Sequence, residues 1–323
     1  MRRFRLLGAA LILVVGLGLG ISCKKRNKLV IGVVPKGQSQ IYWKAVHAGA
    51  EAAAQELGVE VRWNGPASEI DMTQQINIVE DFINQRVDGI VLAPTHGESL
   101  VPIVERAVQE KIPVVIFDSG IRTEKYLSYV STDNYKGGVV AARRMGAVLP
   151  GGGKIAMIGN IPGSVSTVER ENGFRETIAR ESPALQIVDF QYGMAVQSKG
   201  LAVTEDILTA HPDLAGIFCS NEAATVGAVQ AAKAKGVAGK AKIIGFDTSP
   251  NLIEDLQAGN LDSLVVQNPF RMGFLGVRAL VEHLHGKPPE KRIDTGATLV
   301  TRSNFNEPTI QELLLPPIAK YVK

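Results

Sequence analysis

The sequence predicts an α/β protein made of two similar lobes, each built on a parallel β-sheet. Two segments far apart in the chain, VVIFDS (114–119) and KIIGFDT (242–248), are apolar runs that each end at an aspartate. Apolar runs without polar alternation recur between segments of helical spacing, which is typical of parallel sheets covered by helices on both faces. A chain of about 300 residues after its leader is too long for one ordinary hydrophobic core, so we expect two domains.

The first half of the chain alternates strand and helix patterns. The predicted strands are 29–34, 59–63, 89–93 and 113–117. Between them, apolar positions recur at helical intervals in 43–57, 72–83 and 101–108. These β-α repeats predict the first lobe.

The second half repeats the arrangement after residues 130–132. The predicted strands are 154–158, 186–190, 214–219, 243–246 and 263–266, again separated by helical stretches. The Pro-Gly-Gly-Gly segment at 150–153 marks a break between units. We therefore predict a second lobe of the same class.

The first 23 residues have the pattern of a secretory signal. Arg2, Arg3 and Arg5 precede an apolar run at 6–22, and Cys23 follows directly. The segment 20–23, Gly-Ile-Ser-Cys, resembles a bacterial lipobox, in which the cysteine is lipidated, although Gly20 replaces the usual leucine. We expect a lipoprotein anchored through Cys23; a retained membrane-spanning leader is the alternative.

Charge and cysteine content argue against a nucleic-acid partner and against a disulfide within the chain. Without the three leader arginines, the 35 basic residues become 32, equal to the 32 acidic ones, so the mature chain is formally neutral. A nucleic-acid surface would need a clustered basic face, and we expect none. The short basic run at 24–28 is interpreted as a solvated tether. If Cys23 carries lipid, Cys219 has no disulfide partner and is expected to be a buried core residue of a monomer.

Polar residues follow several of the predicted strands. In open parallel sheets, ligands bind in the crevice at the carboxyl ends of the strands. The residues at these ends are Lys36, Asp118, Asn221-Glu222, Asp247 and Gln267. Four of them have a structural alternative: Lys36 as a solvated loop residue, Asn221 as a helix cap, Asp247 as the neighbour of a cap, and Asp118 as a turn residue.

An enzyme is the main alternative class, and the motifs argue against it. The first predicted strand runs into Pro35-Lys36 without the glycine fingerprint of a dinucleotide site, and the GGGK segment at 151–154 precedes a strand, unlike a phosphate-binding loop. No G-x-S-x-G nucleophile elbow is present. The five histidines lack metal-ligand spacing. We therefore predict a binding protein with no catalytic residue, metal or cofactor.

The order of motifs carries a more specific resemblance. Seven segments, taken in order, resemble the periplasmic sugar-binding proteins of ABC importers, in the ribose-binding type I group. They are IGVVPKGQSQIYWKAVHAGA, DGIVLAP, IPVVIFDS, VERENGF, GIFCSNE, IIGFDTSP and LVVQNPF. The similarity covers about residues 28–301. It implies two Rossmann-like, doubly wound lobes joined by a three-segment hinge. The implied domains are 24–131 plus 268–296 and 132–267 plus 297–323.

The resemblance also implies site residues. Five residues match the hydroxyl-binding positions of the family: Asp118, Arg170, Asn221, Asp247 and Gln267. Their side chains supply the hydrogen-bond donors and acceptors that sugar hydroxyls need. Tyr42 and Trp43 match an aromatic pair whose rings can cover the apolar face of a sugar. Their alternative role is core packing at a helix start.

Three departures affect the expected ligand. Ser119 replaces a second basic residue, Met194-Ala195 replaces an aromatic position, and Lys36 resembles the rhamnose and autoinducer-2 binders. We expect a sugar or polyol; a rhamnose-like deoxy sugar or an autoinducer-2-like signal is the alternative. The resemblance further implies an exported protein, in the periplasm or at the cell surface, that delivers its ligand to an ABC permease. The DNA-binding repressors of this fold begin with a helix-turn-helix, whereas this chain begins with a signal.

Overall fold

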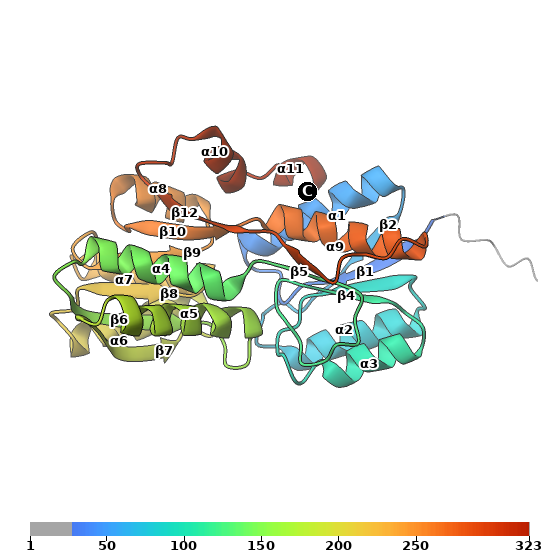
Figure 1. Cartoon of the computed structure of the whole chain (residues 1–323), viewed down its shortest axis with the longest axis horizontal. Coiled ribbons are helices and arrows are strands. Elements are labelled where there is room, and N and C mark those ends of the chain that lie inside the picture. The colour runs from blue at the N-terminus through green and yellow to red at the C-terminus, as the bar shows by residue number, and fades with distance from the viewer. Residues whose placement is uncertain (1–27, 323) are drawn as a thin grey trace, which may run out of the picture.

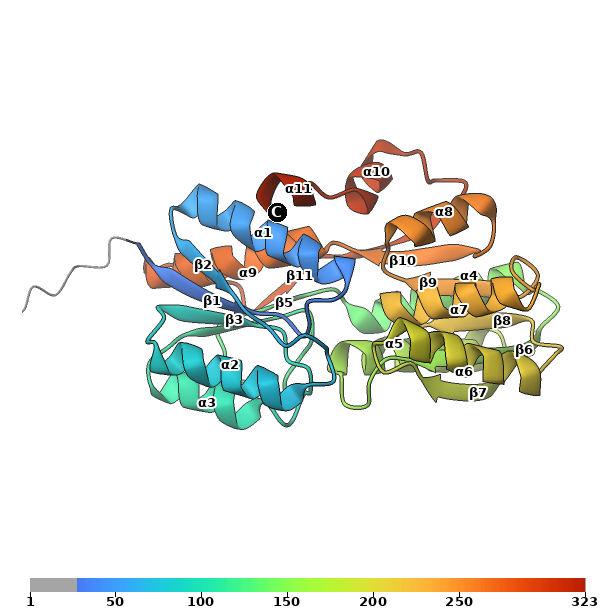
Figure 2. The ribbon, with the colours of Figure 1, turned by 180° about the vertical axis from the view of Figure 1, so that it is seen from behind.

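The computed structural model describes residues 28–322 and contains two α/β units side by side (Figures 1 and 2). The leader and Cys23 lie outside the described residues, so the predictions about them stay predictions. Among the described residues, no helix is long and apolar enough to cross a bilayer.

The first lobe contains a six-stranded sheet in the order β11-β5-β4-β3-β1-β2. Its strands and helices are β1 (Val30–Val34), α1 (Ile41–Leu57), β2 (Glu60–Trp63), α2 (Met72–Asn84), β3 (Gly89–Leu92), α3 (Val101–Gln109), β4 (Val114–Phe117), β5 (Tyr129–Ser131), α9 (Pro269–Leu284) and β11 (Arg292–Asp294). All its pairings are parallel. One core joins the sheet to α1 and α9, and another joins it to α2 and α3.

The second lobe repeats this topology in the order β12-β10-β9-β8-β6-β7. Its elements are α4 (Asn134–Val148), β6 (Gly153–Gly159), α5 (Val165–Glu181), β7 (Leu185–Tyr192), α6 (Gln197–Ala210), β8 (Gly216–Cys219), α7 (Glu222–Ala234), β9 (Lys242–Phe246), α8 (Pro250–Ala258), β10 (Ser263–Gln267), β12 (Ala297–Thr301) and α10 (Pro308–Leu314). The predicted two-lobe fold class is confirmed. One strand departs from the parallel expectation, because β12 pairs antiparallel with β10.

The chain passes between the two sheets at three places, after β5, after β10 and after β11 (Figure 1). The expected domain division stays a prediction. Its last segment needs a correction, however, because α11 (Ile318–Tyr321) packs on α1 of the first lobe although we assigned it to the second. The ring of Tyr321 also lies 5.8 Å from that of Phe270, which belongs to α9 of the first lobe.

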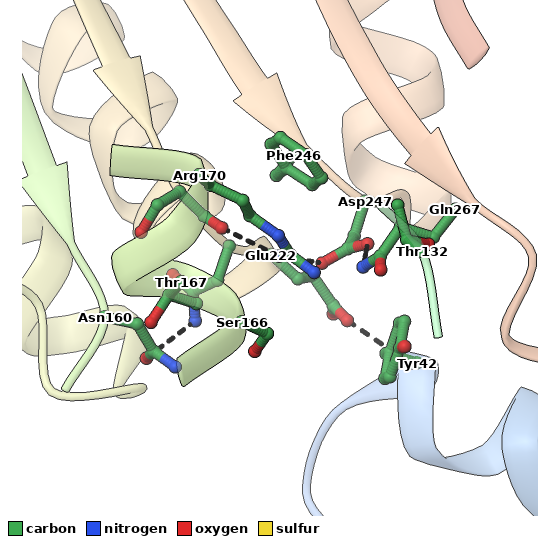
Figure 3. A network of polar contacts seen from close by, with 12 residues as sticks. Tyr42, Thr132, Asn160, Ser166, Thr167, Arg170, Glu222, Phe246, Asp247 and Gln267 are labelled. Atoms are coloured by element: carbon green, nitrogen blue, oxygen red, sulfur yellow. Dashed lines mark hydrogen bonds and ion pairs between the residues drawn. The ribbon is translucent and has the colours of Figure 1, made fainter. Parts of the chain in front are cut away.

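Close helix contacts position the site. Helices α4 and α5 cross where Gly138 faces the backbone of Arg170; a Cβ at position 138 would lie 2.0 Å from the carbonyl oxygen of Arg170. Helix α5 begins after β6 and carries Arg170, whose side chain points towards Asp247 (Figure 3). Glycine is therefore needed at this crossing for α5 to sit at its observed distance.

We predict that Gly138→Ala destabilises the protein by about 1–3 kcal/mol, because the added methyl group overpacks the helix crossing. The control is Gly151→Ala, since a Cβ there would meet nothing within 4 Å. Urea unfolding of both variants tests this. Equal stability of the two variants would contradict the packing role of Gly138.

Candidate functional site

The two aspartates of the repeated motifs have matching backbone geometry. Asp118 follows β4 with φ of 60° and Asp247 follows β9 with φ of 65°, both in the left-handed region that non-glycine residues rarely adopt. Both residues are buried, at 3% and 7% exposure. Strained residues held in place by their surroundings concentrate at functional sites, so we regard the two strand ends as equivalent parts of one site.

Lys36 makes a buried ion pair within the first lobe and hydrogen bonds to the second. Its Nζ lies 2.8 Å from Asp118 Oδ2 and donates to Ser166 Oγ at 3.0 Å and Ser164 Oγ at 3.3 Å. The serines belong to the second lobe, whereas Lys36 follows β1 of the first. Lys36 is only 3% exposed, so the alternative that it is a solvated loop residue is wrong.

The aromatic pair at the start of α1 combines packing with polar contacts. The Tyr42 hydroxyl donates to Asp118 Oδ1 at 2.7 Å, and the Trp43 indole N–H donates to Glu69 Oε1 at 2.9 Å. The two rings meet edge to face at 5.0 Å. Burial, reinforced by the nearby Asp118 and Asp247 charges, raises the pKa of Tyr42 well above its usual range. Tyr42 is therefore a neutral donor at this site.

Arg170 is the buried cation of the second lobe (Figure 3). Its Nε donates to Asn134 Oδ1 at 2.8 Å and its Nη1 donates to the Ser220 carbonyl at 2.9 Å. Nη1 also lies 3.7 Å from Asp247 Oδ2, and the guanidinium stacks 4.1 Å above the Phe246 ring. These contacts fix the guanidinium plane beside Asp247.

Burial raises the pKa of Asp247 to about 6, although Arg170 and the hydrogen bond from Gln267 oppose the shift. Gln267 Nε2 donates to Asp247 Oδ1 at 2.7 Å (Figure 3). Within residues 28–322, Gln267 Oε1 has no hydrogen-bond partner. An unsatisfied buried polar atom costs about 1–3 kcal/mol, so this oxygen is a ready acceptor for a ligand hydroxyl.

Asn221 has the capping role we considered, and its ligand-binding role stays a prediction. Its Oδ1 accepts from the Ala224 N–H at 3.1 Å, which caps α7. Its Nδ2 donates to Asn160 Oδ1 at 3.0 Å. Asn160 and Asn221 follow β6 and β8, the neighbouring strands where the strand order of the second sheet reverses. Such a reversal is the usual ligand position in an open α/β sheet.

The structure adds residues that the sequence analysis did not place in the site. They are Gln40, Glu69, Asn160, Ser164 and Ser166. Glu69 Oε2 accepts from Asn160 Nδ2 at 3.3 Å, and Gln40 Nε2 donates to the Ala195 carbonyl at 3.4 Å, in both cases across the lobes. Asn160 directly follows β6, so the strand-end rule would have found it. Glu69 lies in the loop after β2, where no pattern marks it.

Two cavities flank this polar cluster. One, of about 340 Å³, is lined by Tyr42, Asp247 and Gln267 together with apolar residues of α8 and the C-terminal segment. The other, of about 740 Å³, lies between the β4–β5 loop and α5 and contains none of the predicted site residues. The larger cavity is therefore not where the predicted chemistry gathers. At the cluster itself, side chains from opposite lobes contact each other directly.

The arrangement suits hydroxyl binding. It presents carboxylates, amides and a guanidinium, which together accept from and donate to neighbouring hydroxyl groups. No group of three or more His, Cys, Asp or Glu side chains within residues 28–322 could hold a metal ion. A small polar molecule held between the lobes is the ligand that this chemistry fits.

Comparisons with known proteins agree on one family. Residues 31–288 match the model of the periplasmic binding protein domain. The chain is 30% identical over 277 residues to the ribose import binding protein of Bacillus subtilis, covering 86% of this chain and 88% of that protein.

Two solved structures are also similar. A carbohydrate transporter solute-binding protein of Agrobacterium radiobacter in complex with D-arabinose has 32% identity, a TM-score of 0.88 and coverage of 90% and 100% of the two chains. An ABC transporter solute-binding protein of Agrobacterium vitis with bound D-fucose has 37% identity, a TM-score of 0.86 and coverage of 88% and 100%.

We predict that Asp247→Asn leaves stability within about 1 kcal/mol of wild type, because asparagine tolerates the left-handed backbone and removes a charge that burial disfavours. Asp247→Ala should lose about 1–2 kcal/mol more, because alanine is strained at this φ. Thermal unfolding at pH 7 compares the two. A large and equal loss in both variants would indicate that the carboxylate is structural.

Proposed function

Since the chain belongs to the periplasmic binding protein family, we propose that it captures a sugar or polyol between its two lobes and delivers it to an ABC-type permease. The expected recognition of this family is confirmed. The expectation that the chain is not an enzyme is confirmed as well, because its relatives are binding proteins of transport systems. The ligand and the permease are parts of the proposal.

One observation carries the proposal: the side chains predicted to bind hydroxyls come from both lobes and lie at the strand ends. Lys36, Tyr42, Trp43 and Asp118 come from the first lobe, and Arg170, Asn221, Asp247 and Gln267 from the second. Because the ligand would contact both sets, its binding favours the closed arrangement over an open one. A permease could then distinguish the loaded protein by its closed shape.

The sugar itself is left open by the site. D-arabinose and D-fucose are bound by the two Agrobacterium proteins, and the Bacillus relative is named for ribose. The burial of Lys36 against Asp118 supports keeping the alternative of a rhamnose-like deoxy sugar or an autoinducer-2-like signal. We propose that the protein acts as a monomer outside the cytoplasm, in the periplasm or at the cell surface.

We predict that one sugar from a panel of D-ribose, D-allose, D-arabinose, D-fucose, L-rhamnose and polyols raises the melting temperature. Ligand at 100 times its dissociation constant stabilises a protein by about 2.7 kcal/mol.

Asp118→Asn and Asp247→Asn should each weaken binding of this sugar by about 1.5–3 kcal/mol, because each removes a charge-assisted hydrogen bond. The control is Asp213→Asn, an exposed carboxylate paired with Lys154. Consumption of the sugar by the protein alone, or undiminished binding by both site variants, would refute the proposal.

We further propose that Cys23 is lipidated and anchors the protein. Cys23→Ala should then release it from membranes or leave the leader unprocessed. Membrane fractionation and mass spectrometry of the N-terminus in the native host measure both outcomes. Unchanged processing and attachment would show that another feature holds the protein.

A further inference from the structure

Helix α1 begins at the cleft without a cap from its own lobe. Its N-cap residue, Gln40, makes no side-chain capping bond, and its first turn contains no acidic residue. The first N–H groups of a helix have no partner within the helix, and they carry partial positive charge. A buried helix start of this kind needs an acceptor from elsewhere.

Glu222 of the second lobe supplies that acceptor. Its Oε2 accepts from the Tyr42 N–H at 3.3 Å, a contact between residues 180 apart in the sequence (Figure 3). Glu222 is the first residue of α7 and is only 3% exposed. The contact joins α7 to α1 only when the lobes are together, so opening would uncap α1 and expose Glu222.

We propose that Glu222 is a positioning residue that caps α1 across the cleft, holds Tyr42 and Trp43 in place, and links closure of the lobes to the uptake of a proton. This role of Glu222 concerns closure of the lobes, so it does not depend on which sugar binds. The binding experiments described below rest on the proposed function, whereas the scattering experiment without sugar does not.

The charges around Glu222 account for the proton. Three titratable groups face Glu222: Asp247 after β9, Glu69 in the β2–α2 loop, and Tyr42 of α1. The nearby charges of Arg170 on α5 and of the Lys36–Asp118 pair are held by their own partners. Burial first, and then the Asp247 charge, raises the pKa of Glu222 to about 8, although the α1 N–H groups oppose the shift. In an open, solvated state the group would titrate near the ordinary glutamate value of about 4.3.

The sign follows from the raised pKa. A group whose pKa is higher in the closed form favours closure most below its open-state pKa. This advantage is lost as the pH rises through the closed-state value of about 8. Asp247, whose pKa is about 6, adds a smaller effect in the same direction. Closure should therefore weaken between pH 6 and pH 9.

The test compares Glu222→Gln and Glu222→Ala with the wild type. Glutamine keeps an oxygen that can cap α1 but cannot bind the proton, whereas alanine loses both. The control is Glu171→Gln, another buried carboxylate with a raised pKa, whose partners Asn160 and Ser220 lie in its own lobe. The sugar is whichever of D-ribose, D-arabinose and D-fucose gives the largest thermal shift, titrated calorimetrically at pH 7 in buffers of different ionisation enthalpy.

Wild type and Glu171→Gln should take up roughly half to one proton on binding, and Glu222→Gln close to none. Glu222→Gln should bind at pH 7 at least as tightly as wild type, because glutamine keeps the capping oxygen and needs no proton in order to close. Glu222→Ala should bind about five- to twentyfold more weakly, which corresponds to a lost helix cap. Proton uptake that is unchanged in Glu222→Gln would overturn the proposal. So would binding by Glu222→Ala that equals that of wild type.

Small-angle X-ray scattering of the ligand-free protein provides a test that needs no sugar. The radius of gyration of wild type should increase from pH 6 to pH 9, and that of Glu222→Gln should not. An equal radius for wild type at both pH values would overturn the link to protonation. If no panel sugar binds, the proposed function fails, and this arm still decides the role of Glu222.

Discussion

Charge burial at the cleft is the constraint on which the closed arrangement depends. Lys36, Asp118, Arg170 and Asp247 are all nearly inaccessible to solvent. Removing an ion from water costs several kcal/mol unless partners replace the lost hydration. Lys36 obtains its partners from both lobes, and Arg170 obtains an amide, a carbonyl and an aromatic face. Such contacts contribute little net stability, but they define which geometry of the cleft is permitted.

The two lobes meet this constraint in the same way because they share one topology. Each sheet reverses its strand order at the corresponding place, and each fourth parallel strand ends at an aspartate in the left-handed region. The repeated backbone places a carboxylate on each side of the cleft. Differences between the lobes then come from loops: Lys36 after β1 and Asn160 after β6 occupy corresponding positions with different chemistry.

Much of the fold could be predicted from the sequence because its central strands are buried on both faces and therefore apolar throughout. Strands β5, β11 and β12 were not predicted. Strand β5 has only three residues, β11 has no buried residue, and β12 has a single one, Val300. In the site, the strand-end rule found Asp118, Asn221 and Asp247, and the family resemblance added Arg170. Glu69 and the cross-cleft role of Glu222 could not be predicted, because both depend on how separate lobes face each other.

The C-terminal segment has a mechanical consequence for the hinge. Helix α10 packs into the core of the second lobe through Ile310 and Leu314, whereas α11 packs on α1 of the first. Only residues 315–317 connect them, and two of these are prolines, whose fixed φ makes the link stiff. The lobes are thus tethered at a point separate from the three crossings. A wide separation of the lobes would have to detach α10 or α11 from the lobe on which it packs. The tether therefore restricts the range of open conformations. It thereby reduces the conformational entropy that the protein loses when the lobes close.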